Sequence, residues 1–320
     1  MATVVFVHGI AQEQLAAEVL EKDWLPALAG GVSNFGNDAL AARIWSGGAK
    51  GAIDARMAYY GKPFLDPNAQ GAGDVDINTE PLTPEAEELT EELATALLEA
   101  AAQAARDPHD RTQAANELQE IGGVAGEAQG PKGIVGRPAL NALTRIRWFA
   151  PFGMAVAGRF VWRALTQVSR YLTDDSIRRY AQDQVLDLIG PDTRLVIGHS
   201  LGSVVAYEAL HRATEKLAPG QTVTLITLGS PLGLETIIYQ RLQPQPPHVP
   251  AVVNRWDNFA AQDDLVAARL DIAPMFPPSD GSTVVPTFHK VDTGSKPHDI
   301  THYLTKPSVG EVVSETLTGL

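Results

Sequence analysis

The residues best suited to catalyse a reaction form the pentapeptide Gly198–Gly202, which reads Gly-His-Ser-Leu-Gly. Residues 194–197 before it predict a short buried strand, and residues 203–210 after it predict a helix. A Gly-x-Ser-x-Gly motif in that context is typical of a tight turn that exposes the serine hydroxyl at the end of a sheet. At a helix N-terminus, backbone N–H groups and the helix dipole stabilise developing negative charge. We therefore expect Ser200 to be a nucleophile rather than a simple helix cap.

A serine hydroxyl is a weak nucleophile, so it needs a base that takes its proton and an acid that orients the base. In one fold with such a turn, the acid and then the base follow the serine along the chain, so we look for both after Ser200. Three aspartates follow the strand expected at residues 251–256: Asp257, Asp263 and Asp264. We favour Asp264, because Leu265 and Val266 can anchor a turn under an inward-pointing carboxylate, and we keep Asp263 as the second choice.

Three histidines compete for the role of the base: His289, His298 and His302. His289 falls within the strand expected at residues 284–291, which is a poor place for a base on a loop. His298 begins the segment in which a loop enters a helix, so it can face the end of the sheet. We therefore favour His298 and keep His302 as the second choice.

The oxyanion that forms during attack needs two backbone donors. One is the N–H group of Leu201, the residue after the nucleophile. The other should come from the loop after the first strand, where His8 and Gly9 lead to Ile10. We expect the Ile10 N–H to be this donor, with Gly9 allowing the backbone to approach the site closely.

Buried β-runs alternate with helical patterns in the first and last parts of the chain. We expect strands at residues 3–7, 53–60, 193–197, 222–228, 251–256 and 284–291, and helices at residues 13–29, 203–217, 233–242 and 264–270. This alternation predicts an α/β fold with a mostly parallel central sheet flanked by helices. We assign residues 1–80 and 186–320 to this core and residues 81–185 to a helical insertion.

The insertion changes in charge along its length. A helix should begin at Thr83-Pro84, acidic residues dominate the first half, and a glycine-rich joint is expected at residues 122–136. Residues 152–172 predict an amphipathic helix with Arg159, Arg163 and Arg170 opposite its apolar side chains. We expect a structural cap whose arginines pair with the acidic helix. A lid over an apolar substrate and contact with an anionic membrane surface are the alternatives.

Composition narrows the possible functions. The 320 residues suffice for one large domain or two smaller ones, and a net charge of −13 argues against nucleic acid as a partner. The chain has no cysteine, and its eight histidines lack the spacing of a zinc enzyme, so we expect neither a metal nor a cofactor. The N-terminus lacks the basic segment of a secretory signal, and the apolar stretch at residues 148–158 is too short to span a bilayer. We therefore expect a cytoplasmic protein.

Several segments together resemble the α/β-hydrolase superfamily, and within it lipase-like serine hydrolases. The resemblance rests on residues 5–9 (Val-Phe-Val-His-Gly), Gly198–Gly202, residues 228–233 (Leu-Gly-Ser-Pro-Leu-Gly), and His298 before Tyr303. It covers about residues 1–65 and 190–310 and leaves the insertion uncovered. It implies Ser200 as nucleophile, Asp264 as acid, His298 as base, and Leu201 with Ile10 as oxyanion donors, beside the turn or substrate residues His8, Gly9, His199 and Ser230.

The resemblance leaves one choice of residue open. This chain has Asp263-Asp264-Leu265 where relatives often show Asp-Pro-Val, so either aspartate can be the acid. The expected function is hydrolysis of a small-molecule carboxylic ester, with an apolar acyl part, through an acyl-enzyme. Acyl transfer or thioester cleavage by the same triad is one alternative, and a non-catalytic interaction module of the hydrolase fold is another.

Overall fold

The computed structural model describes residues 1–46, 51–65, 82–127, 138–149, 154–267 and 269–318. The chain divides into two compact units, one formed by Met1–Pro63 with Ser176–Leu320 and the other by Phe64–Asp175. Within the described residues, the first unit contains a six-stranded sheet in which all neighbouring strands are parallel. The predicted α/β class with a parallel central sheet is therefore confirmed.

The sheet consists of short strands, each of which overlaps one of the predicted segments. They are β1 (Val4–Val7), β2 (Ala55–Ala58), β3 (Leu195–His199), β4 (Val223–Leu228), β5 (Val253–Ala261) and β6 (Thr287–Val291). The order across the sheet is β2-β1-β3-β4-β5-β6, so β2 and β3 lie on opposite sides of β1. The carboxyl ends of β1 and β3 therefore flank the point where the topology switches direction, which is where open α/β sheets bind ligands.

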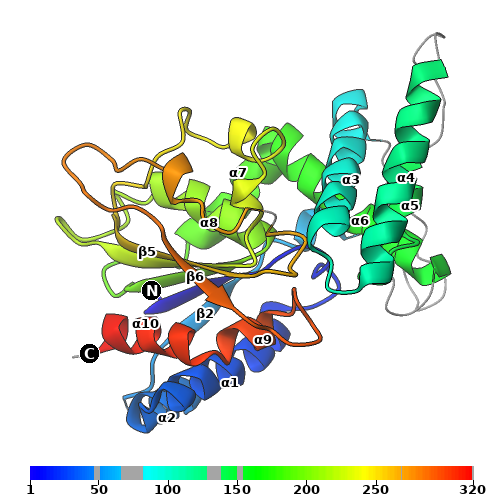
Figure 1. Ribbon diagram of the computed structural model, residues 1–320. Helices are drawn as coiled ribbons and strands as arrows, with labels where there is room; N and C mark the ends of the chain where they lie inside the picture. The colour runs from blue at the N-terminus through cyan, green and yellow to red at the C-terminus, as the bar shows by residue number, and fades with distance from the viewer. Residues whose placement is uncertain (47–50, 66–81, 128–137, 150–153, 268, 319–320) are drawn as a thin grey trace. The chain divides into compact units, whose positions relative to one another are not determined.

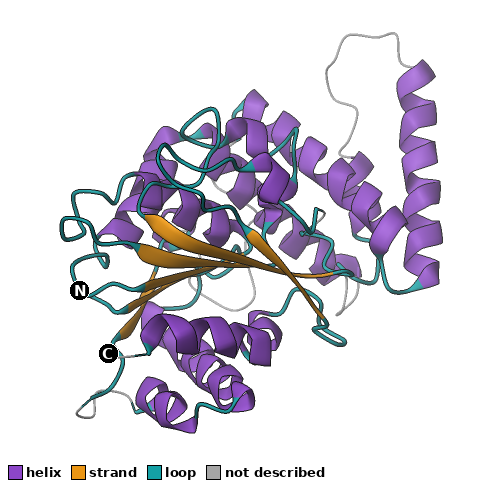
Figure 2. Ribbon diagram, turned by 60° about the vertical axis from the view of Figure 1, so that its left-hand side comes forward, coloured by secondary structure: helices purple, strands orange, loops and turns teal. Residues whose placement is uncertain are grey.

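Helices cover both faces of this sheet (Figures 1 and 2). One face carries α1 (Ala17–Phe35), α2 (Asp38–Trp45), α9 (Ile300–Leu304) and α10 (Pro307–Leu317), and the other carries α8 (Leu201–His211). The core under α1 is apolar: the ring of Phe6 on β1 meets Trp24 edge-on at a centroid distance of 5.3 Å. Removal of such side chains from water is the main stabilising contribution to the fold.

A second helix supports α8 on its face of the sheet. Helix α7 (Asp175–Leu186) lies against α8, where the Gln182 amide donates a hydrogen bond of 2.9 Å to buried Glu208. Arg178 on α7 forms a buried ion pair with the same carboxylate at 3.6 Å. These contacts hold α8, the helix that begins directly after the Ser200 turn.

Two predicted helices begin or end elsewhere. Helix α1 begins at Ala17 rather than residue 13, because the Leu15 N–H closes a separate turn on the Gln12 carbonyl and Ala16 is extended, and it ends at Phe35 rather than residue 29. Helix α8 ends at His211 rather than residue 217, where the N–H of Arg212 bonds back to Ala209. Helix α2 is an element that the sequence pattern did not predict.

The helix predicted at residues 233–242 is wrong, and so is the one predicted at residues 264–270, apart from residue 268, which lies outside the described residues. The first segment forms separate 3₁₀ turns, η2 (Pro231–Gly233) and η3 (Tyr239–Arg241). Its backbone bonds do not keep one helical spacing, since the Ile238 and Tyr239 N–H groups both donate to the Leu234 carbonyl, at 2.8 and 3.0 Å. In the second segment the Asp264 carboxylate accepts the Val266 N–H at 3.1 Å, and such a local side-chain bond competes with a helix. The other 3₁₀ turns are η1 (Lys62–Phe64) and η4 (Ala273–Met275).

The second unit contains α3 (Pro84–Ala104), α4 (Pro108–Glu127), α5 (Pro138–Leu143) and α6 (Met154–Thr173). Helix α3 begins as predicted, because the Thr83 hydroxyl caps the Ala86 N–H at 3.2 Å. The joint predicted at residues 122–136 is wrong for residues 122–127, which continue α4, and its remainder lies outside the described residues. A buried hydrogen bond of 2.9 Å between Thr90 and Ser169 joins α3 to α6.

The predicted amphipathic character of α6 is confirmed for residues 161–172. Val161, Leu165, Val168 and Leu172 are buried, whereas Arg163 and Arg170 are half-buried. The side chain of Arg159 lies outside the described residues. The pairing predicted between these arginines and α3 stays a prediction, as does the lid role.

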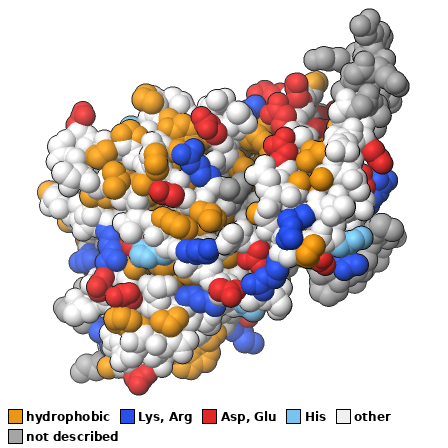
Figure 3. Space-filling view, viewed as in Figure 1, with side chains coloured by type: hydrophobic (Ala, Val, Ile, Leu, Met, Phe, Trp, Pro, Cys, Tyr) orange, Lys and Arg blue, Asp and Glu red, His pale blue; other side chains and the backbone are white. Residues whose placement is uncertain are grey.

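Ion pairs within the second unit join basic residues to the region of α4. Arg145 pairs with Glu117 at 2.8 Å and Arg147 with Asp107 at 3.2 Å. On the face drawn in Figure 3, Lys and Arg side chains likewise lie interspersed with Asp and Glu side chains.

Among the described helices, none combines the length and the apolar character that crossing a bilayer requires.

Candidate active site

Ser200 occupies a sharp turn between β3 and α8. Its backbone is strained, with φ +54° and ψ −131°, values that a residue other than glycine seldom adopts. The flanking glycines explain how the turn fits: a Cβ atom at Gly198 would lie 2.7 Å from the Gly202 oxygen, and one at Gly202 only 2.1 Å from the Val7 oxygen. The motif therefore forms the strand–turn–helix arrangement that its spacing predicts.

Backbone hydrogen bonds connect this turn to the ends of the neighbouring strands. The Ser200 N–H donates to the Leu228 carbonyl at 3.0 Å, and the Gly229 N–H donates to the Phe259 carbonyl at 3.0 Å. Leu228 ends β4 and pairs in register with His199 and Phe259. The carboxyl ends of β3, β4 and β5 thus form one continuous edge at Ser200.

A buried acid–base pair lies at this edge. The His298 Nδ1–H donates to both oxygens of Asp264, each at 2.9 Å. Asp264 follows β5 in a turn in which its own carboxylate also accepts the Val266 N–H. The Asp264 side chain is fully buried, whereas 22% of the His298 side chain remains exposed. Because Nδ1 faces Asp264, Nε2 is the ring nitrogen of His298 on the side away from the acid.

Gly229 places the pair beside the serine turn. A Cβ atom at Gly229 would lie 2.6 Å from Asp264 Oδ2 and 3.1 Å from His298 Nδ1. Gly229 directly follows Leu228, whose carbonyl accepts the Ser200 N–H. The structure therefore brings Ser200, Asp264 and His298 to the same edge of the sheet.

His199, the residue before the serine, supports the base from a second direction. Its ring lies 4.7 Å from the His298 ring, and its Nε2–H donates to the His298 carbonyl at 3.1 Å. Burial, together with the nearby His298, lowers the pKa of His199 well below 6.5. His199 is therefore neutral and adds no positive charge beside the His298 ring.

The two expected oxyanion donors belong to segments that lie next to Ser200. Leu201 is the first residue of α8, so its N–H has no partner within the helix. The loop after β1 passes close to the serine, since a Cβ atom at Gly9 would lie 2.9 Å from the Ser200 Cβ. The next residue in that loop is Ile10, the second expected donor.

His8 determines how this loop is oriented. Its Nδ1–H donates to the Gly9 carbonyl at 2.7 Å, and its Nε2 accepts the Tyr60 N–H at 3.1 Å. Burial lowers the pKa of His8 to about 4, so the ring stays neutral and keeps its single proton on Nδ1. In a trans peptide the carbonyl and the following N–H point in opposite directions, so a fixed Gly9 carbonyl also fixes the Ile10 N–H.

Tyr60 completes the support of this loop. Its ring stacks on the His8 imidazole at 4.1 Å, and its hydroxyl donates to the His8 carbonyl at 2.6 Å. Both groups are buried, so these contacts are shielded from water. The sequence pattern placed His8 at the turn but missed Tyr60, which lies 52 residues further along the chain.

The remaining candidates have other contacts. His302 donates from Nδ1 to the Thr293 carbonyl at 2.6 Å. This hydrogen bond ties His302 to the loop that precedes His298. Ser230 is buried at the sheet edge, and its hydroxyl caps the Leu232 N–H at 3.3 Å, which fits the predicted turn role. Asp263 is also buried, one residue before the aspartate that accepts both bonds from His298.

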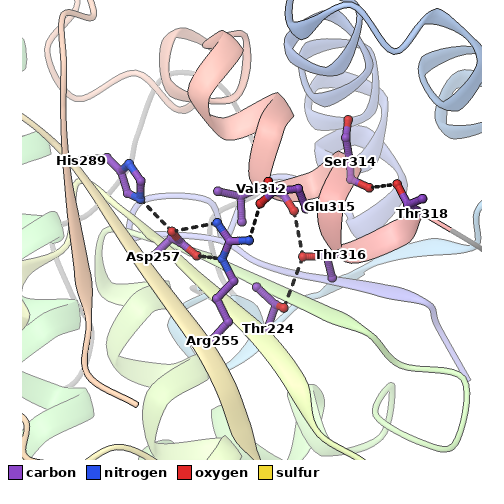
Figure 4. A network of polar contacts seen from close by, with 9 residues as sticks. All are labelled: Thr224, Arg255, Asp257, His289, Val312, Ser314, Glu315, Thr316 and Thr318. Atoms are coloured by element: carbon purple, nitrogen blue, oxygen red, sulfur yellow. Dashed lines mark hydrogen bonds and ion pairs between the residues drawn. The ribbon is translucent and has the colours of Figure 1, made fainter. Parts of the chain in front are cut away.

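The two candidates that sequence reasoning favoured least, Asp257 and His289, contact each other (Figure 4). His289 Nε2 lies 2.7 Å from Asp257 Oδ1, and Arg255 Nε lies 2.6 Å from Asp257 Oδ2. Arg255 also contacts Glu315 on α10 at 2.5 Å. This network links β5, β6 and α10, and it explains why neither residue joins Asp264 and His298.

Sequence reasoning also missed a contact of the acid. The Tyr303 hydroxyl donates to Asp264 Oδ2 at 2.7 Å and accepts the Ala261 N–H at 2.9 Å. Tyr303 lies on α9, and its side chain is completely buried. Its place five residues after His298 is visible in the sequence, but the turn that brings Asp264 to it is not.

Neither a metal cluster nor a known relative adds to this geometry. Among the residues that the structure describes, no group of three or more His, Asp or Glu side chains is arranged to hold a metal ion. Comparison with protein-family models, curated proteins and solved structures gave no match. The assignment of a function therefore depends on the chemistry of the residues themselves.

Proposed function

We propose that this protein is a serine hydrolase of carboxylic esters with an α/β-hydrolase fold. The observation that carries the proposal is the strained Ser200 turn at the same sheet edge as the Asp264–His298 pair. A residue other than glycine keeps a positive φ only where the surrounding structure imposes it, and such strain concentrates at active sites. The topological switch between β1 and β3 supports the same location for a ligand.

The proposed reaction begins with attack of the Ser200 Oγ on the ester carbonyl carbon. His298 accepts the hydroxyl proton at Nε2, while Asp264 holds its Nδ1–H and stabilises the imidazolium. The oxyanion of the tetrahedral intermediate accepts hydrogen bonds from the N–H groups of Leu201 and Ile10. His298 returns the proton to the departing alcohol, which leaves an acyl group on Ser200.

Water completes the cycle. His298 takes a proton from the water molecule as the water oxygen attacks the acyl carbonyl, and then passes that proton to Ser200 as the carboxylic acid departs. These steps use only protein groups and water. We also propose that the substrate is a small-molecule ester with an apolar acyl part.

The test measures hydrolysis of p-nitrophenyl esters of increasing acyl length and labelling by a fluorophosphonate probe. Ser200→Ala should lose about 10⁶-fold in kcat, because the triad acts as a unit, and should lose probe labelling. Ser230→Ala is the matched control, because Ser230 is also a buried serine at this edge but caps a 3₁₀ turn. It should keep labelling and turnover.

Two results would overturn the proposal. One is ester hydrolysis that survives in the Ser200→Ala protein after the folded state has been verified. The other is failure of the probe to label Ser200 in the folded wild-type protein. Optimal activity on the shortest acyl chains would refute only the apolar acyl part.

A further inference from the structure

We propose that Tyr303 is a positioning residue that holds the Asp264 carboxylate in the orientation His298 needs. This inference deepens the proposed function and rests on it. It assigns no contact with substrate to Tyr303, which acts through Asp264. The hydroxyl group, rather than the aromatic ring, is the part of Tyr303 that carries this role.

The contacts of the Asp264 carboxylate show why a third donor matters. His298 Nδ1 lies at the same distance, 2.9 Å, from both oxygens, so His298 alone does not favour one rotation of the carboxylate over another. Val266 N–H binds Oδ1 at 3.1 Å, and the Tyr303 hydroxyl binds Oδ2 at 2.7 Å. One donor on each oxygen therefore fixes the carboxylate plane.

Tyr303 is itself fixed by the sheet. Its hydroxyl oxygen accepts the N–H of Ala261, the last residue of β5, at 2.9 Å. The chain of donors thus runs from the backbone of β5 through Tyr303 to Asp264, and each bond in such a chain polarises the next. Helix α9, only five residues long, carries Tyr303 and directly follows His298 and its cap residue Asp299. One short element therefore places both the base and the group that orients the acid.

The Tyr303 hydroxyl remains protonated across the pH range in which the activity would be measured. Burial raises the pKa of Tyr303 far above 10, and the adjacent Asp264 carboxylate raises it further. The hydroxyl therefore acts as a permanent donor. Among the described residues, the titratable groups that act on His199 or Tyr303 include Asp263, Asp299 and His8. Lys296 lies 3.3 Å from the Asp299 carboxylate.

The test compares Tyr303→Phe with the wild-type enzyme. The phenylalanine ring keeps the packing but removes the hydroxyl, so Asp264 loses a donor, and the negative charge facing His298 increases. The acid–base pair then binds its proton more tightly, and the acid limb of the kcat/KM profile should move to higher pH by about one unit. We expect kcat to fall about tenfold with little change in KM, since the substrate does not contact Tyr303.

Tyr207→Phe is a closely matched control. The Tyr207 hydroxyl is also attached to a fully buried ring, accepts a backbone N–H from His248 at 3.2 Å and donates to the His248 carbonyl at 2.9 Å. Both variants lose one buried hydroxyl and should lose similar stability. A purely structural role for Tyr303 predicts the same pH profile in both variants, and that result would overturn the inference.

A measurement without substrate separates this inference from the proposed function. The pH titration of the His298 ring signals by NMR should shift upward in Tyr303→Phe and remain unchanged in Tyr207→Phe. If Ser200→Ala remains active but this shift occurs, the proposed reaction fails while the contact with Asp264 stands. If Ser200→Ala is inactive but neither the titration nor the acid limb moves, the role of Tyr303 alone is refuted.

Discussion

Replacement of Gly229 by alanine should damage the acid–base pair without removing any of its atoms. Gly229 has φ +53°, and a Cβ atom added there would lie 2.6 Å from Asp264 Oδ2. The same Cβ would lie 3.1 Å from His298 Nδ1 and 3.2 Å from its Cε1 atom. The new methyl group would therefore compete for space with both partners of the pair.

The size of the effect follows from these distances. Ordinary van der Waals contact at a Cβ atom begins at 3.4 Å, so the Asp264 oxygen must move by about 0.8 Å if it alone gives way. A misplacement of about 1 Å at a catalytic group can cost about 10²-fold in rate. We therefore expect kcat/KM for an ester substrate to fall by about 10²-fold in Gly229→Ala.

A second glycine separates the steric effect from backbone strain. Gly220 has φ +74°, but a Cβ atom there would meet nothing within 4 Å. Gly220→Ala should lose about 1–2 kcal/mol of stability from the left-handed backbone alone and keep its activity. Gly229→Ala should lose more, because it adds the steric conflict.

The assay measures kcat/KM with a p-nitrophenyl ester and the free energy of unfolding by urea titration for both variants. Temperature and pH are kept well within the range in which both proteins are folded. If Gly229→Ala retains the kcat/KM of Gly220→Ala, the argument that Gly229 makes room for the acid–base pair is wrong. A loss of activity in Gly220→Ala would show instead that backbone strain acts at a distance.

Two further predictions concern the acid and the buried histidines. Asp264→Asn should lower kcat by about 10⁴-fold because the base loses its orienting carboxylate. Asp263→Asn and Asp257→Asn should keep most of their turnover. Equal losses of kcat in all three variants would show that Asp264 is not the acid that orients His298. The free energy of unfolding should decrease as the pH falls from 6.5 towards 4, because burial lowers the pKa of His8 to about 4 and the unfolded chain therefore binds more protons in this window. His8 alone accounts for up to about 3 kcal/mol, fully present above pH 6.5, and urea unfolding that is independent of pH across this window would contradict it.

The sequence predicts best where one residue type is required locally. The Ser200 turn needs a glycine at both ends because each Cβ position is occupied by backbone atoms, and that requirement is visible as a spacing of residues. The short strands are equally visible, since β-branched and apolar runs between helices have few alternatives in a parallel sheet. These local signals were enough to predict the α/β class with its parallel sheet and the sharp turn at Ser200.

The sequence predicts poorly where a distant partner decides the structure. The helix expected at residues 264–270 does not form, because Asp264 binds its own loop as well as His298 and Tyr303, which lie 34 and 39 residues away. Strand β5 continues to Ala261 rather than ending at residue 256 because its last residues pair with β6. Neither partner is identifiable from the local pattern of hydrophobic residues.

The same reasoning explains how the strained serine can persist. Backbone N–H groups connect successive strand ends at the active edge: Ser200 to Leu228, Gly229 to Phe259, and Ala261 to the Tyr303 hydroxyl. Each of these donors lies at or just after the end of a strand whose last residues are buried, so the apolar core resists movement of the edge. A positive φ at Ser200 costs about 1–3 kcal/mol. The framework can support this cost, because relaxing the turn would break the hydrogen bond from the Ser200 N–H to Leu228. The geometry proposed for catalysis is therefore a property of the sheet as much as of the residues that react.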